Sequence, residues 1–337
     1  MDANQRTAQV QSRVQDGMSA GLHDIDAAFL AGWPLPQPNA GGDKELRGHV
    51  LILGGSREMP GAVILAATAA MRAGAGKLTI ATGASVAQLV AMAIPEARVI
   101  GLEEHETDGF KLDALSALDP LTDRVNAMLV GPGMRDPAST ARLVHALLPG
   151  IYEAEVNLVL DACGMDALLH PPHDWPEGRP LRFERPVILT PHCGEMAHLT
   201  GREKDTLVDA PDGPAQEAAQ AWNAVVALKG RRTVIAAPDG MLWQHQGAGN
   251  VGLAASGSGD VLAGIIAGLA ARGAPPAQAA CWGVALHARA GDRLAARMGT
   301  LGYLARELPG EIPALLEQLA GPDGGEATTI RPVPGEQ

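Results

Sequence analysis

Residues 49–82, HVLILGGSREMPGAVILAATAAMRAGAGKLTIAT, decide the fold class of this chain. The apolar run HVLILGG predicts a buried strand, the Ala-rich stretch that begins at Pro60 predicts a helix, and KLTIAT predicts a second strand. Nearly continuous apolar strands separated by a helix are typical of a parallel sheet that helices cover on both faces. This segment therefore predicts a βαβ unit.

The same alternation continues along the chain. Further strands are expected at residues 98–102, 127–133, 157–162, 186–192 and 225–230, and further helices at residues 84–94, 137–148, 194–201, 215–225, 260–273, 277–298 and 312–320. TVIAA and MLWQH flank the turn Pro238-Asp239-Gly240 and predict an antiparallel hairpin. We expect an α/β fold, a three-layer α/β/α sandwich whose central sheet is mostly parallel, with this hairpin at its edge.

The pattern predicts one catalytic domain, at residues 44–320. Residues 1–43 form a lead-in with one short helix around residues 24–31 and a loop rich in Pro and Gly, and little chemistry is expected there. Residues 321–337 form a polar tail. The sequence has no repeat of fixed period.

Composition limits the classes of partner. Hydrophobic residues make up 46% of the chain but aromatic residues only 3%, so small aliphatic side chains must fill the core and surround any nucleobase. The formal net charge is -12 and no basic run is present, so we expect no nucleic-acid partner. A phosphate ligand must then be held by local devices such as helix N-termini and single basic side chains.

The cysteines and the apolar segments predict a cytoplasmic protein with no membrane contact. The three cysteines are far apart and odd in number, which favours a reducing compartment and disfavours a zinc site. The N-terminus has no signal-peptide pattern, and the longest apolar stretch, residues 261–271, is shorter than the ~20 residues that span a bilayer.

The segment GLAASGSGDVLAGIIAGLAARG carries the strongest functional signal. Gly257, Ser258 and Gly259 directly precede Asp260 and an apolar helix. Glycines allow a ligand to approach the backbone, and a helix start offers free N–H groups to a phosphate. Asp260 could then take a proton from a hydroxyl group that attacks phosphorus. Alternatively, Ser258 is a helix N-cap and Asp260 an acid that the helix dipole favours.

A second candidate is the segment that follows the buried run VVAL. In a parallel sheet ligands bind at the carboxyl ends of the strands, so Lys229 could meet a phosphate there as a point charge, or it could be an ordinary surface lysine. Gly230, Arg231, Arg232 and Thr233 extend the same loop as possible phosphate or ribose contacts.

Two other strand ends carry ionisable groups. His192 could bind a ligand or cap the next helix, which Glu195 opens, and the sequence favours neither role. Cys193 is expected to be an inert thiol, because no helix start or basic cluster lowers its pKa clearly in the sequence. Asp161 is the last residue of NLVLD. It could cap the following helix, bind water coordinated to magnesium, or support another residue of the site, and we favour the helix cap.

Together these segments resemble the ADP-dependent NAD(P)H-hydrate dehydratases, a family with the ribokinase-like fold. The resemblance runs from about residue 44 to residue 313. GSGD indicates only the wider kinase superfamily, whereas GGS with PGA, and TPH with GE, indicate the dehydratase branch. Departures are Cys193, where the family usually has Pro, and Cys163, where an acid is common.

The resemblance implies roles for individual residues. Ala62, Gly133, His192 and Asp260 would contact hydrated NADH or NADPH. The residues expected to contact ADP or its product AMP are Lys229, Gly230, Arg231, Arg232, Thr233, Gly257, Ser258 and Gly259. Magnesium would bridge the phosphates, and no side chain is expected to be a metal ligand. Family members commonly form homotetramers, so a homo-oligomer is expected.

The implied activity is that of a hydro-lyase in which ADP phosphorylates the hydroxyl group of the hydrate, with Asp260 as the base. The products would be NAD(P)H, AMP and phosphate. Two alternatives remain at this point: a small-molecule kinase of the same fold, acting on a vitamin or a sugar, and a nucleotide sensor without catalytic activity.

Overall fold

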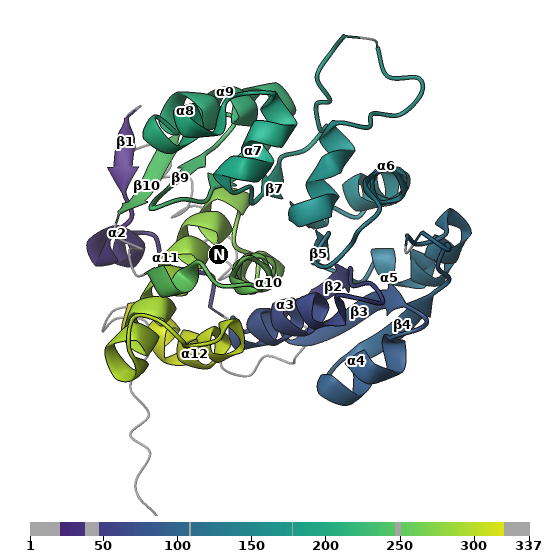
Figure 1. Cartoon of the computed structure of the whole chain (residues 1–337), viewed down its shortest axis with the longest axis horizontal. Coiled ribbons are helices and arrows are strands. Elements are labelled where there is room, and N and C mark those ends of the chain that lie inside the picture. The colour runs from purple at the N-terminus through teal and green to yellow at the C-terminus, as the bar shows by residue number, and fades with distance from the viewer. Residues whose placement is uncertain (1–20, 38–46, 108, 177, 247–250, 320–337) are drawn as a thin grey trace, which may run out of the picture.

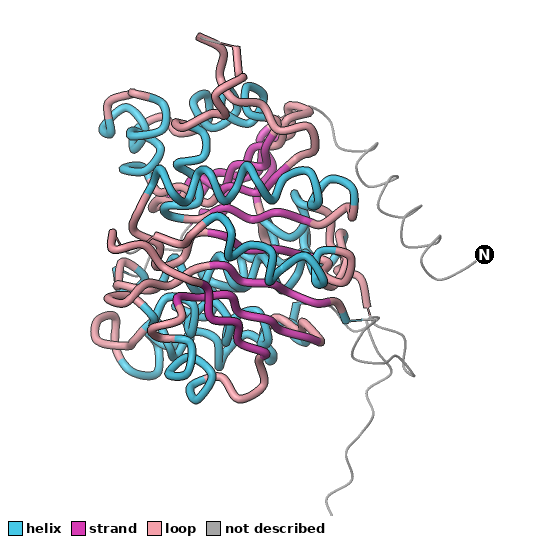
Figure 2. Tube along the Cα trace, turned by 90° about the vertical axis from the view of Figure 1, so that its right-hand side faces the viewer, coloured by secondary structure: helices cyan, strands magenta, loops and turns pink. Residues whose placement is uncertain are grey.

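A computed structural model describes residues 21–37, 47–107, 109–176, 178–246 and 251–319. Its strands form one ten-stranded sheet with helices on both faces (Figures 1 and 2). The strands are β1 Leu22–Asp24, β2 His49–Leu53, β3 Lys77–Gly83, β4 Arg98–Leu102, β5 Ala127–Val130, β6 Asn157–Leu160, β7 Val187–Leu189, β8 Ala224–Leu228, β9 Arg232–Ala236 and β10 Leu242–Gln246. The three-layer α/β architecture predicted from the alternation of apolar runs is confirmed.

The helices divide between the two faces of the sheet. One face carries α2 Ala27–Gly32, α3 Pro60–Arg72, α4 Ala87–Ala93, α10 Ser258–Ala271, α11 Pro276–Met298 and α12 Leu308–Leu319. The other carries η2 Leu112–Leu118, α5 Asp119–Thr122, α6 Pro137–Glu153, η3 Ala162–Leu168, α7 Cys193–Thr200, α8 Lys204–Asp209 and α9 Asp212–Trp222. Short 3-10 turns, η4 Val251–Leu253 and η5 Ala305–Glu307, precede α10 and α12.

The strand order is β1-β10-β9-β8-β7-β6-β5-β2-β3-β4, and β1 and β4 lie at opposite sides of the molecule (Figure 1). All neighbouring pairs are parallel except the two that involve β9, which runs against β8 and β10. The predicted hairpin is therefore present as β9 and β10. It is not the outermost pair, because β1 pairs in parallel with β10 on its outer side.

Each strand of the sheet's centre sends alternate side chains into two cores. In β2, Val50 and Ile52 belong to the core under α3 and α10, and Leu51 and Leu53 belong to the core under α6. All four are fully buried. This explains why the strands appear in the sequence as unbroken apolar runs.

Small residues let α10 pack directly against α3. A Cβ atom added to Gly264 would lie 2.2 Å from the carbonyl oxygen of Ala66, and one added to Gly268 would lie 2.5 Å from that of Ala70. The helix axes can approach this closely only because neither glycine has a side chain. The low aromatic content of the chain is thus matched by close backbone packing.

The lead-in contributes to the same sheet and core. The short helix predicted around residues 24–31 is α2, which begins at Ala27 and follows the unpredicted strand β1. Trp33 is 2% exposed, stacks on Trp243 with ring centroids 5.9 Å apart, and accepts a hydrogen bond from Trp282 Nε1 through its carbonyl group. The boundary predicted at residue 44 stays a prediction, and residues 1–20 and 321–337 lie outside the described residues.

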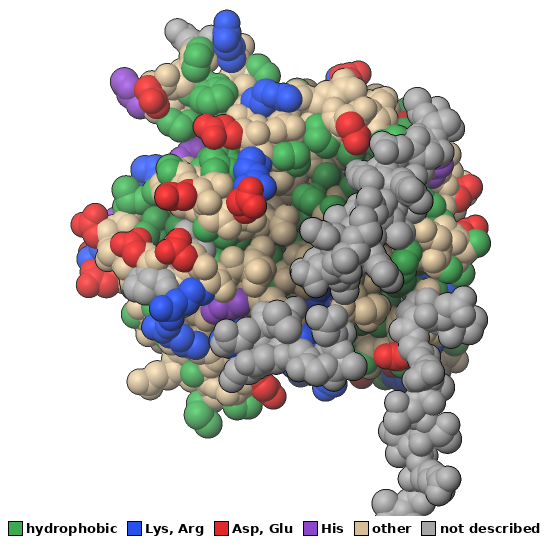
Figure 3. Space-filling view, turned by 180° about the vertical axis from the view of Figure 1, so that it is seen from behind, with side chains coloured by type: hydrophobic (Ala, Val, Ile, Leu, Met, Phe, Trp, Pro, Cys, Tyr) green, Lys and Arg blue, Asp and Glu red, His purple; other side chains and the backbone are tan. Residues whose placement is uncertain are grey.

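The prediction that the protein has no nucleic-acid partner stays a prediction, and charged side chains of both signs are interspersed on one face of the described surface (Figure 3). On the face drawn in Figure 3, Lys and Arg side chains stand in small separate groups among Asp and Glu side chains, without a basic stripe. Among the described residues, no helix is both long enough and apolar enough to cross a membrane.

Replacing Trp33 by Ala is expected to lower the free energy of unfolding by about 3–5 kcal/mol, the usual cost of truncating a buried Trp. Urea denaturation measures the loss. Met92, on α4, is 83% exposed, so Met92→Ala is the control and should change stability by less than about 0.5 kcal/mol. Equal, small losses in both variants would show that the lead-in is not part of the core.

Candidate functional site

The loops at the carboxyl ends of five strands contact one another in sequence along one edge of the sheet. After β2 and β5, the N–H of Gly55 donates to the carbonyl oxygen of Pro132 at 2.7 Å. After β5 and β6, Gly131 passes so near Asp161 that an added Cβ atom would lie 1.8 Å from the Asp161 carbonyl oxygen. After β7 and β8, the N–H of Lys229 donates to Pro191 at 2.8 Å. The predicted strand-end residues thus line one edge.

Ala62 and Gly133, both predicted to contact the substrate, lie against each other. Gly133 has φ 70°, a left-handed conformation that favours glycine. A Cβ atom added there would lie 2.8 Å from the Cβ of Ala62 and 2.6 Å from the carbonyl oxygen of Met59. Two loops therefore meet at Gly133 without room for a side chain.

The start of α10 differs from one of the two sequence interpretations. Its N-cap is Gly257, with φ 86° and no side-chain cap, so the prediction of Ser258 as N-cap is wrong. Ser258 is the first helical residue, and its hydroxyl group lies 2.9 Å from Nε2 of His287 on α11. Asp260 is in the first turn, as predicted. Helix geometry leaves N–H groups of this turn without a partner inside the helix.

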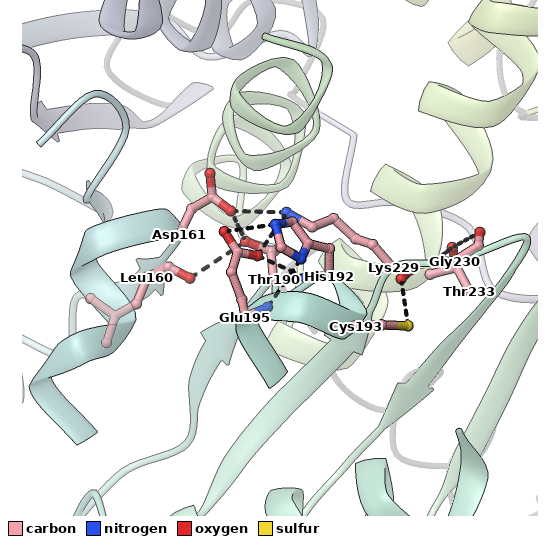
Figure 4. A network of polar contacts seen from close by, with 9 residues as sticks. All are labelled: Leu160, Asp161, Thr190, His192, Cys193, Glu195, Lys229, Gly230 and Thr233. Atoms are coloured by element: carbon pink, nitrogen blue, oxygen red, sulfur yellow. Dashed lines mark hydrogen bonds and ion pairs between the residues drawn. The ribbon is translucent and has the colours of Figure 1, made fainter. Parts of the chain in front are cut away.

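Lys229 lies over this helix start. A Cβ atom added to Gly259 would be 3.4 Å from Lys229 Nζ. The ammonium group, 19% exposed as part of its side chain, is 3.2 Å from Asp161 Oδ1 and 3.7 Å from Glu195 Oε2 (Figure 4). Burial alone would lower the pKa of Lys229, but the charges of Asp161, Glu195 and Asp260 outweigh it and raise that pKa. Lys229 is therefore a charged residue of the site and no ordinary surface lysine.

Asp161 does not cap the helix that follows it. It occupies the N-cap position of η3, yet its side chain makes no capping hydrogen bond, so the favoured interpretation is wrong. Its carboxylate instead accepts hydrogen bonds from Thr190 Oγ1 at 2.6 Å and from Lys229 Nζ at 3.2 Å (Figure 4). Asp161 is 3% exposed and Thr190 is fully buried. These contacts fix the side chain that holds Lys229.

Asp260 has an unusual acidity for an aspartate. Burial raises its pKa to about 7, the negative charge of Asp161 adds to the effect, the ammonium group of Lys229 opposes it, and Glu195 raises it further. A carboxylate with a pKa near neutrality is a suitable general base, because it is available in its basic form and can hold the proton it takes.

His192 caps α7, which is one of the two roles that the sequence left open. Its Nδ1 accepts the N–H of Glu195 at 3.0 Å, and the N–H of His192 donates to Glu195 Oε2 at 2.7 Å. Because Nδ1 accepts, the proton of the neutral ring is on Nε2. The side chain of His192 is 58% exposed, so this N–H can still donate to a ligand.

Cys193 is the first residue of α7, one position before the helix expected at residues 194–201. Burial nevertheless raises the pKa of the Cys193 thiol, with the charge of Lys204 acting in the opposite direction. The Sγ atom lies 3.6 Å from the carbonyl oxygen of Lys229. The structure therefore supports an inert thiol.

The remaining candidates lie in the turn between β8 and β9 and at the start of β9. Thr233 is 6% exposed, and its Oγ1 lies 3.4 Å from the carbonyl oxygen of Gly230, which closes the turn. Arg232 pairs with Asp212 and with Gln244, both at 2.8 Å, so its guanidinium group is already held. Arg231 is exposed. Contacts of these residues with a nucleotide stay predictions.

Thr190 and His287 were not predicted as parts of the site. Thr190 ends the apolar run PVILT, and His287 lies within a long amphipathic helix segment, so neither is distinguished by local sequence. Among the described residues, no group of three or more His, Cys, Asp or Glu side chains is arranged to hold a metal ion.

Comparison with known proteins identifies the family. The family model for NAD(P)H-hydrate dehydratase matches residues 50–314, which include every residue of the site described above. The chain belongs to the NAD(P)H-hydrate dehydratase family. It is 48% identical to the ADP-dependent (S)-NAD(P)H-hydrate dehydratase of Xanthomonas campestris, over 88% of this chain and 97% of that protein.

Solved structures agree with this assignment. The crystal structure of the ADP/ATP-dependent NAD(P)H-hydrate dehydratase of Bacillus subtilis, co-crystallised with ATP/Mg²⁺, is 31% identical, with a TM-score of 0.73 over 89% of this chain and 100% of that chain. A ribokinase-like superfamily protein of Enterococcus faecalis shares the fold, with a TM-score of 0.74, 24% identity, and coverage of 90% and 98%. The chain also matches bifunctional NAD(P)H-hydrate repair enzymes, of which it spans about half, 52% and 53% of two of them.

The raised pKa of Asp260 predicts a dependence of stability on pH. The ordinary pKa of an aspartate is 3.8, and that of folded Asp260 is about 7. Between these two pH values the folded protein keeps a proton on Asp260 that the unfolded chain has lost. The contribution of Asp260 to stability therefore falls as pH rises through this range. Asp260→Asn removes the effect. We expect the variant to gain about 1–2 kcal/mol over the parent between pH 5 and pH 8, measured by urea denaturation.

The control is Glu96→Gln, because Glu96 is exposed and lies in the turn between α4 and β4. Its stability relative to the parent should not change over the same pH range. A gain for Asp260→Asn that is the same at both pH values would contradict the raised pKa.

Proposed function

We propose that this protein dehydrates the hydrated forms of NADH and NADPH with ADP as the phosphoryl donor, giving NAD(P)H, AMP and phosphate. The observation that carries the proposal is the position of Asp260: a carboxylate with a pKa of about 7 stands in the first turn of α10 beside the ammonium group of Lys229. The ADP-dependent relative from Xanthomonas campestris, 48% identical over almost its full length, supports the same activity.

The reaction needs a better leaving group than hydroxide. Asp260 takes the proton of the hydrate's hydroxyl group as its oxygen attacks the terminal phosphorus of ADP, and AMP leaves. The lone pair of the ring nitrogen then expels phosphate. Loss of a proton from the neighbouring ring carbon restores the double bond of NAD(P)H. A kinase-like site thus serves an elimination, because phosphoryl transfer prepares the group that departs.

The phosphate side of the site is formed by α10 and Lys229. A phosphate group at the start of α10 would meet free N–H groups and the positive end of the helix dipole. Lys229 Nζ, above Gly259, would contact the same group as a point charge. Backbone amides and an ammonium group held in place before the reaction stabilise charge as it develops on the phosphoryl oxygens.

Magnesium fits this arrangement as a companion of the nucleotide. Mg²⁺ commonly binds through one or two carboxylates together with substrate phosphates. Asp161 and Glu195 are the acidic side chains beside Lys229, and both would be within the reach of such an ion. When bound, the ion neutralises phosphate charge.

The substrate side is formed by the loops after β2 and β5, with α7. Ala62 and Gly133 would contact the hydrate, and the close packing of Gly133 against Ala62 and Met59 holds these two loops together. The Nε2–H of His192 would donate to the substrate, while its Nδ1 remains bound to the N–H of Glu195. A cytoplasmic location and a homotetramer are part of the same proposal.

The pH profile of the reaction tests the role of Asp260. Because the base acts in its ionised form, kcat/KM for the hydrate should rise with pH through about 7, the pKa of Asp260 in the free enzyme. Asp260→Asn should lower kcat by about 10²–10⁴-fold without unfolding the protein. The assay follows NADH absorbance, free phosphate and AMP after addition of hydrated NADH with ADP or ATP.

Asp161→Asn provides a directional control. Since the charge of Asp161 raises the pKa of Asp260, its removal should move the rise of kcat/KM to lower pH. A folded Asp260→Asn variant with parental turnover would refute the proposed base. Release of a phosphorylated product without recovery of NADH would indicate a kinase, and nucleotide binding without turnover would indicate a sensor.

A further inference from the structure

His287 lies beneath the start of α10 and has no part in the reaction described above. It belongs to α11, is partly buried, and its Nε2 is 2.9 Å from Ser258 Oγ. Burial lowers the pKa of His287 to about 4; a hydrogen bond with the Ser258 backbone opposes this, and the charge of Lys229 supports it. The ring is therefore neutral at physiological pH, and one of its nitrogens is a donor and the other an acceptor.

Ser258 stands between two glycines at the start of α10. It is 5% exposed and stands between Gly257, in the left-handed conformation, and Gly259. Glycines on both sides allow many backbone directions, so the orientation of the first helical turn requires an anchor. The Ser258 N–H donates to Ala255 at 3.2 Å, and its hydroxyl group is held by His287.

The loop before α10 also rests on α11 through small residues. The side chain of Leu253 packs against Gly291 of α11. A Cβ atom added to Gly291 would lie 2.7 Å from Leu253 Cδ2. Gly252 in turn lies against Tyr303, with 2.5 Å from an added Cβ atom to the ring. These apolar contacts hold the loop against α11. The hydrogen bond between Ser258 and His287 orients the last residues of the loop, where α10 begins.

We propose that His287 is a positioning residue for the reaction, which acts through Ser258 to orient the first turn of α10. The N–H groups of Gly259 and Asp260 and the carboxylate of Asp260 all depend on that turn. The inference rests on the proposed function and adds a residue to it that touches neither the hydrate nor the phosphates.

A neutral imidazole suits this place for an electrostatic reason. The helix start and Lys229 already present positive charge at this point, so a positively charged side chain below them would repel Lys229 and weaken the arrangement that the carboxylates stabilise. Imidazole supplies a rigid hydrogen-bonding group without that charge. Misplacing reacting groups by about 1 Å can cost on the order of 100-fold in rate.

The test compares His287→Leu, Ser258→Ala, the double variant and His287→Gln with the parent enzyme, whose turnover of hydrated NADH establishes the proposed function first. Each single variant should lower kcat by about tenfold or more, with KM for the hydrate changed less than about threefold. The double variant should be no slower than the slower single variant, because both remove one interaction. His287→Gln, whose amide can reach Ser258, should restore most of kcat.

Two further measurements separate positioning from general instability. Cys281→Ala truncates a fully buried side chain six residues earlier on α11 and should leave kcat within about twofold of the parent. Calorimetric titration with ADP needs no hydrate: Ser258→Ala and His287→Leu should bind ADP about tenfold more weakly, and Cys281→Ala and His287→Gln like the parent.

The inference is overturned if Ser258→Ala retains parental kcat and ADP affinity, because His287 would then act without Ser258. It is also overturned if the two single losses multiply in the double variant, or if Cys281→Ala is as slow as His287→Leu. If the parent binds ADP but does not restore NADH, the proposed function fails, and the ADP affinities alone decide whether His287 orients the helix start.

Discussion

The ammonium group of Lys229, held among three carboxylates at the start of a helix, is the interaction on which the site depends. Positive charge is unfavourable at a helix N-terminus, where the dipole is also positive. Asp161 and Glu195 lie within 3.7 Å of Nζ and make the arrangement stable. Burial, with a further contribution from the charges of Asp161 and Glu195, raises the pKa of Asp260 to about 7. One cluster would therefore supply both the anion site and the base of the proposed reaction.

The fold brings this cluster together from distant parts of the chain. Asp161, Glu195 and Lys229 follow β6, β7 and β8, which are neighbours in the sheet, so their carboxyl ends meet at one edge. Asp260 arrives from α10, whose glycines pack against the backbone of α3. That contact also relates α10 to the start of α3, where Ala62 lies. The close packing of α10 on α3 thus sets the distance between Asp260 and Ala62.

Much of the fold was predictable because buried parallel strands must be apolar throughout, as residues 49–82 show. β1 was not, since three residues, Leu22–Asp24, carry no period, and their pairing with β10 depends on a segment about 220 positions away. Within the site, residue types at strand ends predicted which side chains gather, but not their partners. Asp161 binds Thr190, 29 positions later, and Ser258 binds His287, also 29 positions later. Local sequence therefore favoured caps where the structure has long-range hydrogen bonds.

A crystal structure of the protein with ADP and Mg²⁺ tests the central claim most directly. The account predicts the terminal phosphate at the N–H groups of Gly259 and Asp260, with Lys229 Nζ in contact with it and the Asp260 carboxylate facing the space beside Ala62 and Gly133. Phosphates bound elsewhere, or Asp260 turned away from that space, would contradict it.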